Sequence, residues 1–139
     1  MVARTNSTKA RGIWFAGHVV LYFDEGRRGQ ATFVVWENVY LILARNSREA
    51  AKKAEKLGRA DCVEDGLTAD GKPVRLVFGG VRKVISCAAN PMANDGVLTS
   101  DVPVLYSGIE ATFSKFLVHG RKKLRSLIAG QPTSIDYQQ

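Results

Sequence analysis

Apolar residues gather in runs along most of the chain after residue 11. Residues 13–23, IWFAGHVVLYF, are almost all apolar or aromatic, and residues 31–44, ATFVVWENVYLILA, are rich in β-branched and aromatic side chains. Both compositions favour β-strands. The polar segment DEGRRG between the two runs favours a turn, so the pattern predicts an antiparallel hairpin.

The pattern then changes to a helical one over residues 46–58, NSREAAKKAEKLG. Asn46 or Ser47 supplies an N-cap, Glu49 lies in the first turn, and Gly58 is expected to end the helix. One stripe of this predicted helix is apolar and mostly small, and consists of Ala50, Ala51, Ala54 and Leu57. A face of alanines would let the helix lie close to a sheet.

Two more strands and a second helix are predicted in the rest of the chain. Residues 74–87, VRLVFGGVRKVISC, and 104–113, VLYSGIEATF, are strand-like, and the glycine pair in the first of them indicates a bulge. Residues 88–103 carry many turn formers and predict the longest loop. Residues 116–130, FLVHGRKKLRSLIAG, predict a helix with one apolar and one basic face.

The element order strand, strand, helix, strand, strand, helix predicts an α+β fold, with a mostly antiparallel sheet of about four strands that carries both helices. The length of 139 residues favours one domain. We expect a flexible basic arm over residues 1–11, a single α+β domain over 12–130 and a C-terminal tail over 131–139. An apolar content of 45% with 24% charged residues is typical of globular proteins.

Charge and cysteine content indicate which partners and which cellular compartment to expect. The chain has 20 Lys and Arg against 13 Asp and Glu, a formal charge of +7, which favours loose attraction to nucleic acid or to acidic proteins. Cys62 and Cys87 lack metal-site spacing, and two reduced thiols are favoured over one disulfide. The first apolar run is too short to cross a bilayer. We therefore expect a cytoplasmic protein without a membrane segment, cofactor or metal site.

The segments ENVYLILARNSREAAKKAEKLG, VRLVFGGVRKVI and SGIEATFSKF, with a Trp-Phe pair in the first strand, carry a family resemblance. In this order they resemble the bacterial family called domain of unknown function 4288, over roughly residues 12–116. The residues that match its pattern are Trp14, Phe15, Glu37, Tyr40, Leu41, Ala44, Glu49, Ala50, Ala54, Gly108 and Glu110. The resemblance supports the fold and implies no activity.

Two surfaces are candidates for binding. The basic face of the last helix and the N-terminal arm together suggest phosphate contacts, through Arg4, Lys9, Arg11, Arg121, Lys122, Lys123 and Arg125. A basic helix face is more often simply solvated. The second candidate is an aromatic face of the first two strands, formed by Trp14, His18, Tyr22, Trp36, Asn38 and Tyr40. Such a face suits a protein interface or homodimer better than stacking on nucleic acid.

Signals for catalysis are sparse. Gly-x-Ser-x-Gly, P-loop and His-Glu-x-x-His motifs are absent from the sequence, and neither His18 nor His119 has a partner nearby in the chain. Glu37 and Glu110 lie in strand patterns where carboxylates are unusual, so they either share a site or pair with Arg75 or Lys83.

We therefore expect a non-catalytic protein-binding module, of the size of an immunity- or defence-associated partner, with no small-molecule substrate evident. Weak, non-specific nucleic-acid binding is the alternative, and an unrecognised enzyme is the least favoured class.

Overall fold

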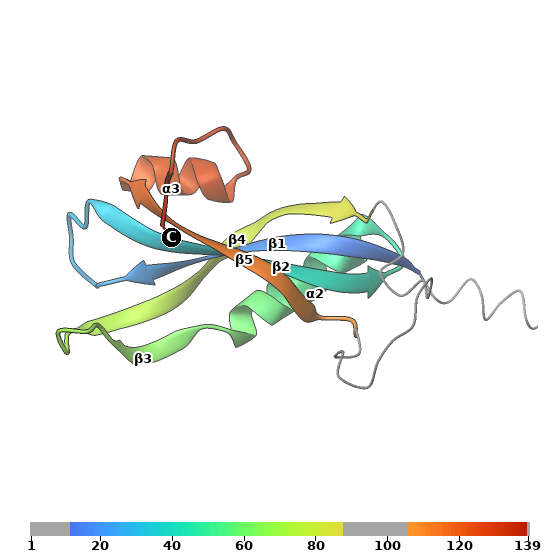
Figure 1. Ribbon diagram of the computed structural model, residues 1–139, viewed down its shortest axis with the longest axis horizontal. Coiled ribbons are helices and arrows are strands. Elements are labelled where there is room, and N and C mark those ends of the chain that lie inside the picture. The colour runs from blue at the N-terminus through green and yellow to red at the C-terminus, as the bar shows by residue number, and fades with distance from the viewer. Residues whose placement is uncertain (1–11, 88–105, 139) are drawn as a thin grey trace, which may run out of the picture.

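A computed structural model describes residues 12–87 and 106–138 of the chain (Figure 1). Its elements are β1 (Ile13–Asp24), β2 (Thr32–Ala44), α2 (Ser47–Ala60), β3 (Val63–Leu67), β4 (Pro73–Ser86), β5 (Ile109–His119), α3 (Arg121–Ile128) and β6 (Asp136–Tyr137). The strands form one sheet in the order β3-β4-β1-β2-β5-β6, and every pairing is antiparallel. The predicted α+β class, the antiparallel sheet and the two helices are confirmed. The sheet has six strands, so the expected number of about four is wrong.

The two additional strands escaped the hydrophobic pattern for different reasons. β3 reads VEDGL and is mostly exposed at the edge of the sheet, so it lacks the apolar run of a central strand. β6 has only two residues, which pair with Phe116 and Leu117 of β5. Residues 131–139, which the sequence predicts to be a tail, therefore include the other edge of the sheet.

The second helix is shorter than predicted. Residues 116–119 belong to β5, where Phe116 and Val118 are buried and alternate with more exposed neighbours. Their pairing with residues 32–35 of β2 holds them extended, so the tertiary context outweighs the helical pattern. The helix starts only after Gly120, which has a φ of 98°. Eight residues, Arg121–Ile128, remain helical.

α2 covers one face of the sheet. Asn46 is its N-cap, as predicted, and accepts a hydrogen bond from the Glu49 amide at 2.9 Å. Gly58 does not end the helix but lies inside it, where a Cβ would approach the Val19 side chain to 2.5 Å. Glycine is thus needed here because the helix and sheet are in close contact. The core on this side contains Phe15, Val19, Leu21, Tyr40, Ile42, Ala44, Ala50, Ala54 and Leu76.

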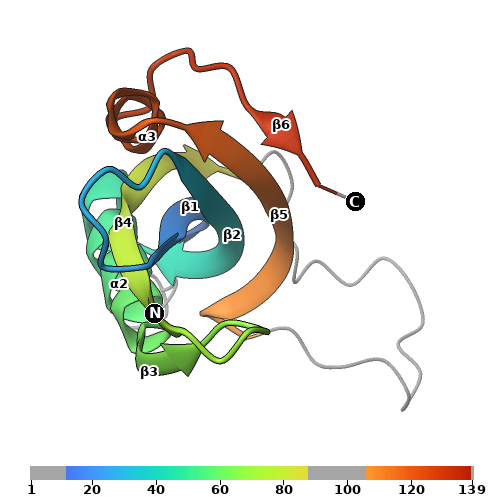
Figure 2. The same ribbon diagram turned by 90° about the vertical axis from the view of Figure 1, so that its left-hand side faces the viewer.

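α3 covers part of the opposite face, and Figure 2 shows how strongly the sheet curls between β4 and β5. Leu124 and Leu127 of α3 pack with the buried residues Val20, Phe33, Val35, Phe116 and Val118. Ile128 lies over Gly79 and Gly80 of β4, which leave room for it. The bulge predicted at this glycine pair is confirmed by register shifts between β1 and β4. The sheet is therefore packed on both faces, and each face has its own core.

Neither helix within residues 12–87 and 106–138 is long and apolar enough to cross a membrane.

Candidate functional site

The predicted aromatic surface is divided between the two faces of the sheet. In the β1–β2 register Leu21 is opposite Trp36, and Val19 is opposite Asn38. Residues directly opposite each other in an antiparallel pair share a face. Trp36, Asn38 and Tyr40 therefore lie with the apolar residues of β1 on the α2 side, and Trp14, His18 and Tyr22 lie on the other side.

The sequence could not reveal this division because alternation alone does not fix the register between two strands. A shift of one residue moves every side chain of a strand to the opposite face. The six residues therefore do not form one continuous surface, and the prediction of a single aromatic face is wrong.

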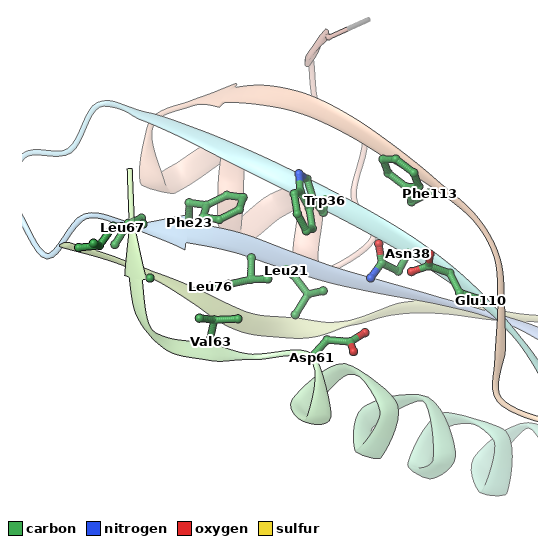
Figure 3. A pocket seen from close by; sticks show the side chains of 12 residues that line it. Leu21, Phe23, Trp36, Asn38, Asp61, Val63, Leu67, Leu76, Glu110 and Phe113 are labelled. Atoms are coloured by element: carbon green, nitrogen blue, oxygen red, sulfur yellow. The ribbon is translucent and has the colours of Figure 1, made fainter. Parts of the chain in front are cut away.

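On the α2 side the sheet carries a groove with a volume of about 570 Å³ (Figure 3). We call it the aromatic groove. Its lining residues are Leu21, Phe23, Trp36, Asn38, Asp61, Val63, Gly66, Leu67, Val74, Leu76, Glu110 and Phe113. The floor is apolar, and the large side chains of Val63, Leu67 and Phe113 at its edges are exposed. Exposed apolar edges around an apolar floor are typical of a binding site.

Trp36 lies at the centre of the groove. Its ring meets Phe23 edge to face, with 5.1 Å between ring centroids and an interplanar angle of 87°, and is 6.5 Å from the ring of Phe113. The indole Nε1 is buried and has no hydrogen-bond partner within the described residues. The three rings come from β1, β2 and β5, so the curled sheet itself assembles this aromatic surface.

The polar groups of the groove gather at one end, where Figure 3 shows Asn38, Asp61 and Glu110. The Tyr40 hydroxyl donates to Asp61, and the Asn38 amide donates to the Tyr40 oxygen at 3.3 Å. Burial and the nearby Asp61 carboxylate raise the pKa of Tyr40 above its usual range, so this phenol stays protonated. Burial, followed by the charge of Asp61, raises the pKa of Glu110. The groove is thus apolar over most of its length and acidic at one end.

Glu37 lies on the opposite face of the sheet and is almost fully buried. Arg82 donates to both of its carboxylate oxygens, and His18 Nδ1 lies 2.7 Å from Oε1. Burial alone would raise the pKa of Glu37, but the hydrogen bonds from Arg82 and His18 outweigh it and lower the pKa. These three residues, which we call the Glu37 cluster, join the three adjacent strands β4, β1 and β2.

The shared site suggested for Glu37 and Glu110 does not exist, because the two carboxylates lie on opposite faces of the sheet. Tyr40 and Glu110 are opposite each other in the β2–β5 register, which places Glu110 on the α2 side. The alternative partners Arg75 and Lys83 are also wrong for Glu37. Arg75 instead pairs with Asp24 at 2.9 Å.

The Glu37 cluster left a weak signal in the sequence. Arg82 is the extra residue of a bulge, since His18 is opposite Lys83 while Val19 is opposite Val81. A bulge redirects a side chain, and the neighbouring glycine pair indicated that β4 would contain one. The sequence did not show which of the basic residues near that bulge would reach Glu37.

The basic face of α3 is exposed, as its pattern predicted. Lys122, Lys123 and Arg125 are exposed, whereas Leu124 and Leu127 are buried, and none of the three cations forms an ion pair within the described part of the chain. The guanidinium of Arg121 lies 5.1 Å from the centre of the Phe33 ring, so this cation also packs on the core. Arg4, Lys9, Arg11 and the predicted loop 88–103 lie outside the described residues.

The remaining candidates have simple environments. His119 pairs with Asp136 at 2.6 Å on the surface, and Cys62 and Cys87 are free thiols. Residues 12–87 and 106–138 contain no group of three His, Cys, Asp or Glu side chains that would hold a metal ion.

Comparison with known proteins identifies the chain by family alone. No curated protein and no solved structure matches it. The family model described as "Domain of unknown function (DUF4288)" matches residues 14–100, which is most of the chain and includes β1 to β4. This match confirms the resemblance carried by the Trp-Phe strand and the alanine-rich helix, although Gly108 and Glu110 lie beyond the matched range. The chain therefore belongs to the DUF4288 family, a domain of unknown function.

Proposed function

We propose that this protein is a non-catalytic binding module, which recognises a segment of another protein in the aromatic groove. The observation that carries the proposal is an apolar groove of about 570 Å³ that is acidic at one end. Small binding modules of this size include immunity- and defence-associated proteins, and we propose such a role for this protein.

The apolar part of the groove supports recognition of an apolar anchor. Phe113 is 57% exposed and Leu67 is 68% exposed, although both are large apolar side chains at the edge of a buried core. Covering them removes apolar surface from water, which contributes about 25 cal/mol per Å² before the cost of association is subtracted. Aromatic residues in such a pocket are the usual centres of binding energy at protein interfaces.

The acidic end of the groove indicates that the bound segment carries a positive charge. Asp61 and Glu110 lie together, whereas the protein as a whole carries a formal charge of +7. A Lys or Arg near the apolar anchor would be attracted to these carboxylates, and its charge would oppose the burial and the Asp61 repulsion that together raise the pKa of Glu110. The proposed ligand is therefore a segment with a large apolar residue and a nearby cation.

Selection from a random peptide library displayed on phage tests this proposal. Peptides enriched on the purified protein are expected to contain a large apolar residue with Lys or Arg within a few positions. Phe113→Ser should weaken the binding of a selected peptide about tenfold or more, because it removes an aromatic contact. Asp61→Asn combined with Glu110→Gln should weaken mainly the peptides that carry the cation.

Ile85→Ser is the matched control. Ile85 is 49% exposed on another strand and does not line the groove, so this variant loses a similar apolar side chain elsewhere on the surface. The proposal fails if no peptide is enriched or if Phe113→Ser and Ile85→Ser bind a selected peptide equally. Self-association that Phe113→Ser abolishes would show that a second copy of the chain occupies the groove, and would also contradict it.

Weak nucleic-acid binding is a second candidate function, supported by a different observation. Three cations, Arg121, Lys122 and Lys123, begin α3, and the helix has no acidic residue in its first turn. Cations at a helix N-terminus oppose the helix dipole, so this arrangement does not serve helix stability. Bound phosphate groups would offset the repulsion among these cations and between them and the positive end of the helix dipole. A fall in nucleic-acid affinity with rising salt concentration tests this function.

A further inference from the structure

A second cavity of about 560 Å³ lies on the α3 side of the sheet, away from the aromatic groove. We call it the polar pocket. The Glu37 cluster, formed by His18, Glu37 and Arg82, lines it together with Thr112, Ser114 and Thr133. The segment between α3 and β6 supplies Thr133 and closes one side. Unlike the aromatic groove, this pocket has a charged, hydrogen-bonded cluster at its base.

The Glu37 cluster fixes the orientation of His18. Because the Glu37 carboxylate accepts, the proton of a neutral His18 ring lies on Nδ1, which is 2.7 Å from Oε1. The other ring nitrogen, Nε2, then carries a free lone pair. No hydrogen bond to Nε2 occurs within residues 12–87 and 106–138, and the side chain keeps 18% of its surface exposed. His18 therefore offers an acceptor at the pocket.

Arg82 offers donors, but little net charge. Its Nε and one terminal nitrogen donate to Glu37 at 3.1 and 2.7 Å, so the Glu37 carboxylate already compensates the guanidinium. An anion would gain little from a compensated cation, and it would meet the lone pair of His18 Nε2. A hydroxyl group suits both residues, because it donates to Nε2 and accepts from an N–H of Arg82.

The walls of the pocket also suit a ligand that carries hydroxyl groups. Thr112 and Ser114 add two hydroxyls that can donate and accept, and the Thr133 hydroxyl, which donates to the Gln131 carbonyl at 3.0 Å, can accept. Phe116 and Tyr137 add an apolar surface, where their rings meet at 73° with 5.9 Å between centroids. A sugar ring has hydroxyls around its edge and C–H groups on its faces, and therefore matches both kinds of wall.

We propose that the polar pocket binds a small neutral polyhydroxylated molecule of the sugar class. His18 Nε2 accepts a hydrogen bond from one ligand hydroxyl, Arg82 donates to an oxygen of the ligand, and Ser114 and Thr133 bind the remaining hydroxyls. Glu37 is a positioning residue, since it holds His18 and Arg82 and its own oxygens are already occupied. A volume of about 560 Å³ is within the usual range for small-molecule sites.

The role assigned to the pocket is binding, not covalent catalysis by Ser114. Ser114 of β5 is opposite Glu37 of β2, whereas His18 belongs to β1 on the other side of β2. Two strand spacings of about 4.8 Å each separate the backbones of β1 and β5. Ser114 is thus opposite Glu37 and not next to His18. A nucleophilic serine would need the imidazole of His18 within hydrogen-bond distance to activate it.

Nuclear magnetic resonance of the two histidine rings provides the test. The full chain is titrated at neutral pH with D-glucose, D-ribose and methyl α-D-glucoside, and in parallel with sodium acetate and sodium phosphate. At least one sugar is expected to shift the His18 ring signals in a saturable way, with a dissociation constant of about 1 mM. His119, which pairs with Asp136 outside the pocket, is the internal control and should not respond.

Two variants locate the binding site. Thr133→Val keeps the shape of the side chain and removes one hydroxyl, so it should weaken sugar binding about threefold to tenfold. Ser126→Ala is the matched control, because it removes a hydroxyl from α3 outside the pocket lining and should change nothing. Both variants keep the Glu37 cluster, so the result does not depend on a substitution in the buried network.

Three outcomes would overturn the proposal. One is the absence of a saturable His18 shift at sugar concentrations about tenfold above a millimolar dissociation constant. Another is a shift caused by acetate or phosphate but by no sugar, which would make this an anion site. The third is equal binding by Thr133→Val and Ser126→Ala. None of these outcomes depends on the aromatic groove, which lies on the other face of the sheet.

Discussion

Arg82 donates two hydrogen bonds to Glu37, from Nε to Oε2 at 3.1 Å and from a terminal nitrogen to Oε1 at 2.7 Å. Their strands, β4 and β2, are not neighbours, because β1 lies between them. The ion pair therefore crosses a strand on the face of the sheet, and His18 of β1 joins it from between. This arrangement makes the Glu37 cluster a polar connection among three adjacent strands, β4, β1 and β2.

Replacing Glu37 by Gln should destabilise the protein by about 3 kcal/mol at neutral pH, because it leaves the largely buried charge of Arg82 without compensation. Urea unfolding of the two proteins measures the difference. The side chains of Glu37 and Arg82 are only 10% and 22% exposed.

Arg75→Met is the control for that experiment. It breaks the ion pair with Asp24, but Arg75 is 52% exposed, so the loss should stay below about 1 kcal/mol. Equal effects of Glu37→Gln and Arg75→Met would mean that the Glu37 cluster behaves as a surface ion pair.

The contribution of Glu37 should depend on pH in the acid range. Its pKa in the folded protein is lower than the ordinary value of 4.5, so its stabilisation is fully present above that value. The stabilisation is lost as the pH falls through the lowered pKa, because the carboxylate must then be protonated in both states. Unfolding free energies of the wild type and Glu37→Gln should therefore differ by a constant amount near neutrality and converge below pH 4.5. A difference that grows on acidification would contradict the lowered pKa.

Glu110 should behave in the opposite way. Burial and the charge of Asp61 raise its pKa, so the fold favours its protonated form. Its ionised form opposes folding once the pH exceeds the raised pKa. Glu110→Gln should therefore increase the unfolding free energy at neutral pH and leave it unchanged well below pH 4.5, as measured by urea unfolding at both pH values. A variant that is less stable than the wild type at neutral pH would show that Glu110 has a stabilising partner.

Gly58→Ala should destabilise the protein, although alanine is normally the better residue inside a helix. The new Cβ would lie 2.5 Å from Val19 Cγ1 and 2.7 Å from Phe78 Cδ1, and Val19 is fully buried. Overpacking of this kind costs about 1–3 kcal/mol, which exceeds the gain of about 0.5–1 kcal/mol from replacing a helical glycine. Thermal unfolding compares it with Lys52→Ala, an exposed position of α2 that should stay within about 0.5 kcal/mol of the wild type. Stabilisation by Gly58→Ala would mean that α2 moves easily away from the sheet.

The long strands and α2 could be predicted because each carries a local signal. Apolar runs mark β1, β2 and β4, and Asn46 and Glu49 mark the start of α2. The same local reasoning missed the end of β5, because the sequence FLVH followed by basic residues fits a helix as well as a strand. Pairing with β2 decides between them, and that pairing depends on residues about 80 positions away in the sequence.

Both candidate sites depend on features that the chain does not show locally. Trp36 and Phe113 meet in the aromatic groove only because β2 pairs with β5 and the sheet is curled. Arg82 reaches Glu37 because a bulge shifts β4 by one residue relative to β1. The sequence indicated unusual residues, such as a carboxylate at position 37, but register and bulges decide which of them come together.

Any binding of nucleic acid by the basic face of α3 should depend on the salt concentration. If Lys122, Lys123 and Arg125 contact phosphates, the affinity for DNA or RNA should fall with salt, with a logarithmic slope of about −0.7 to −0.9 for each contact. Replacing these three residues by Gln should then weaken binding to all sequences alike, because phosphate contacts do not read bases. Fluorescence anisotropy with labelled duplex and single-stranded probes, over a range of salt concentrations, measures both effects.

Arg121 requires separate treatment in that experiment, because its guanidinium packs on Phe33 as well as facing solvent. The triple variant without Arg121→Gln should keep the stability of the wild type, whereas adding Arg121→Gln should lower it by about 0.5–1 kcal/mol through the lost cation–π contact. We expect weak binding at low salt, little binding near physiological salt, and a smaller salt slope for the triple variant. Submicromolar binding at physiological salt that the triple variant loses would instead make nucleic acid, and not a protein segment in the aromatic groove, the favoured partner.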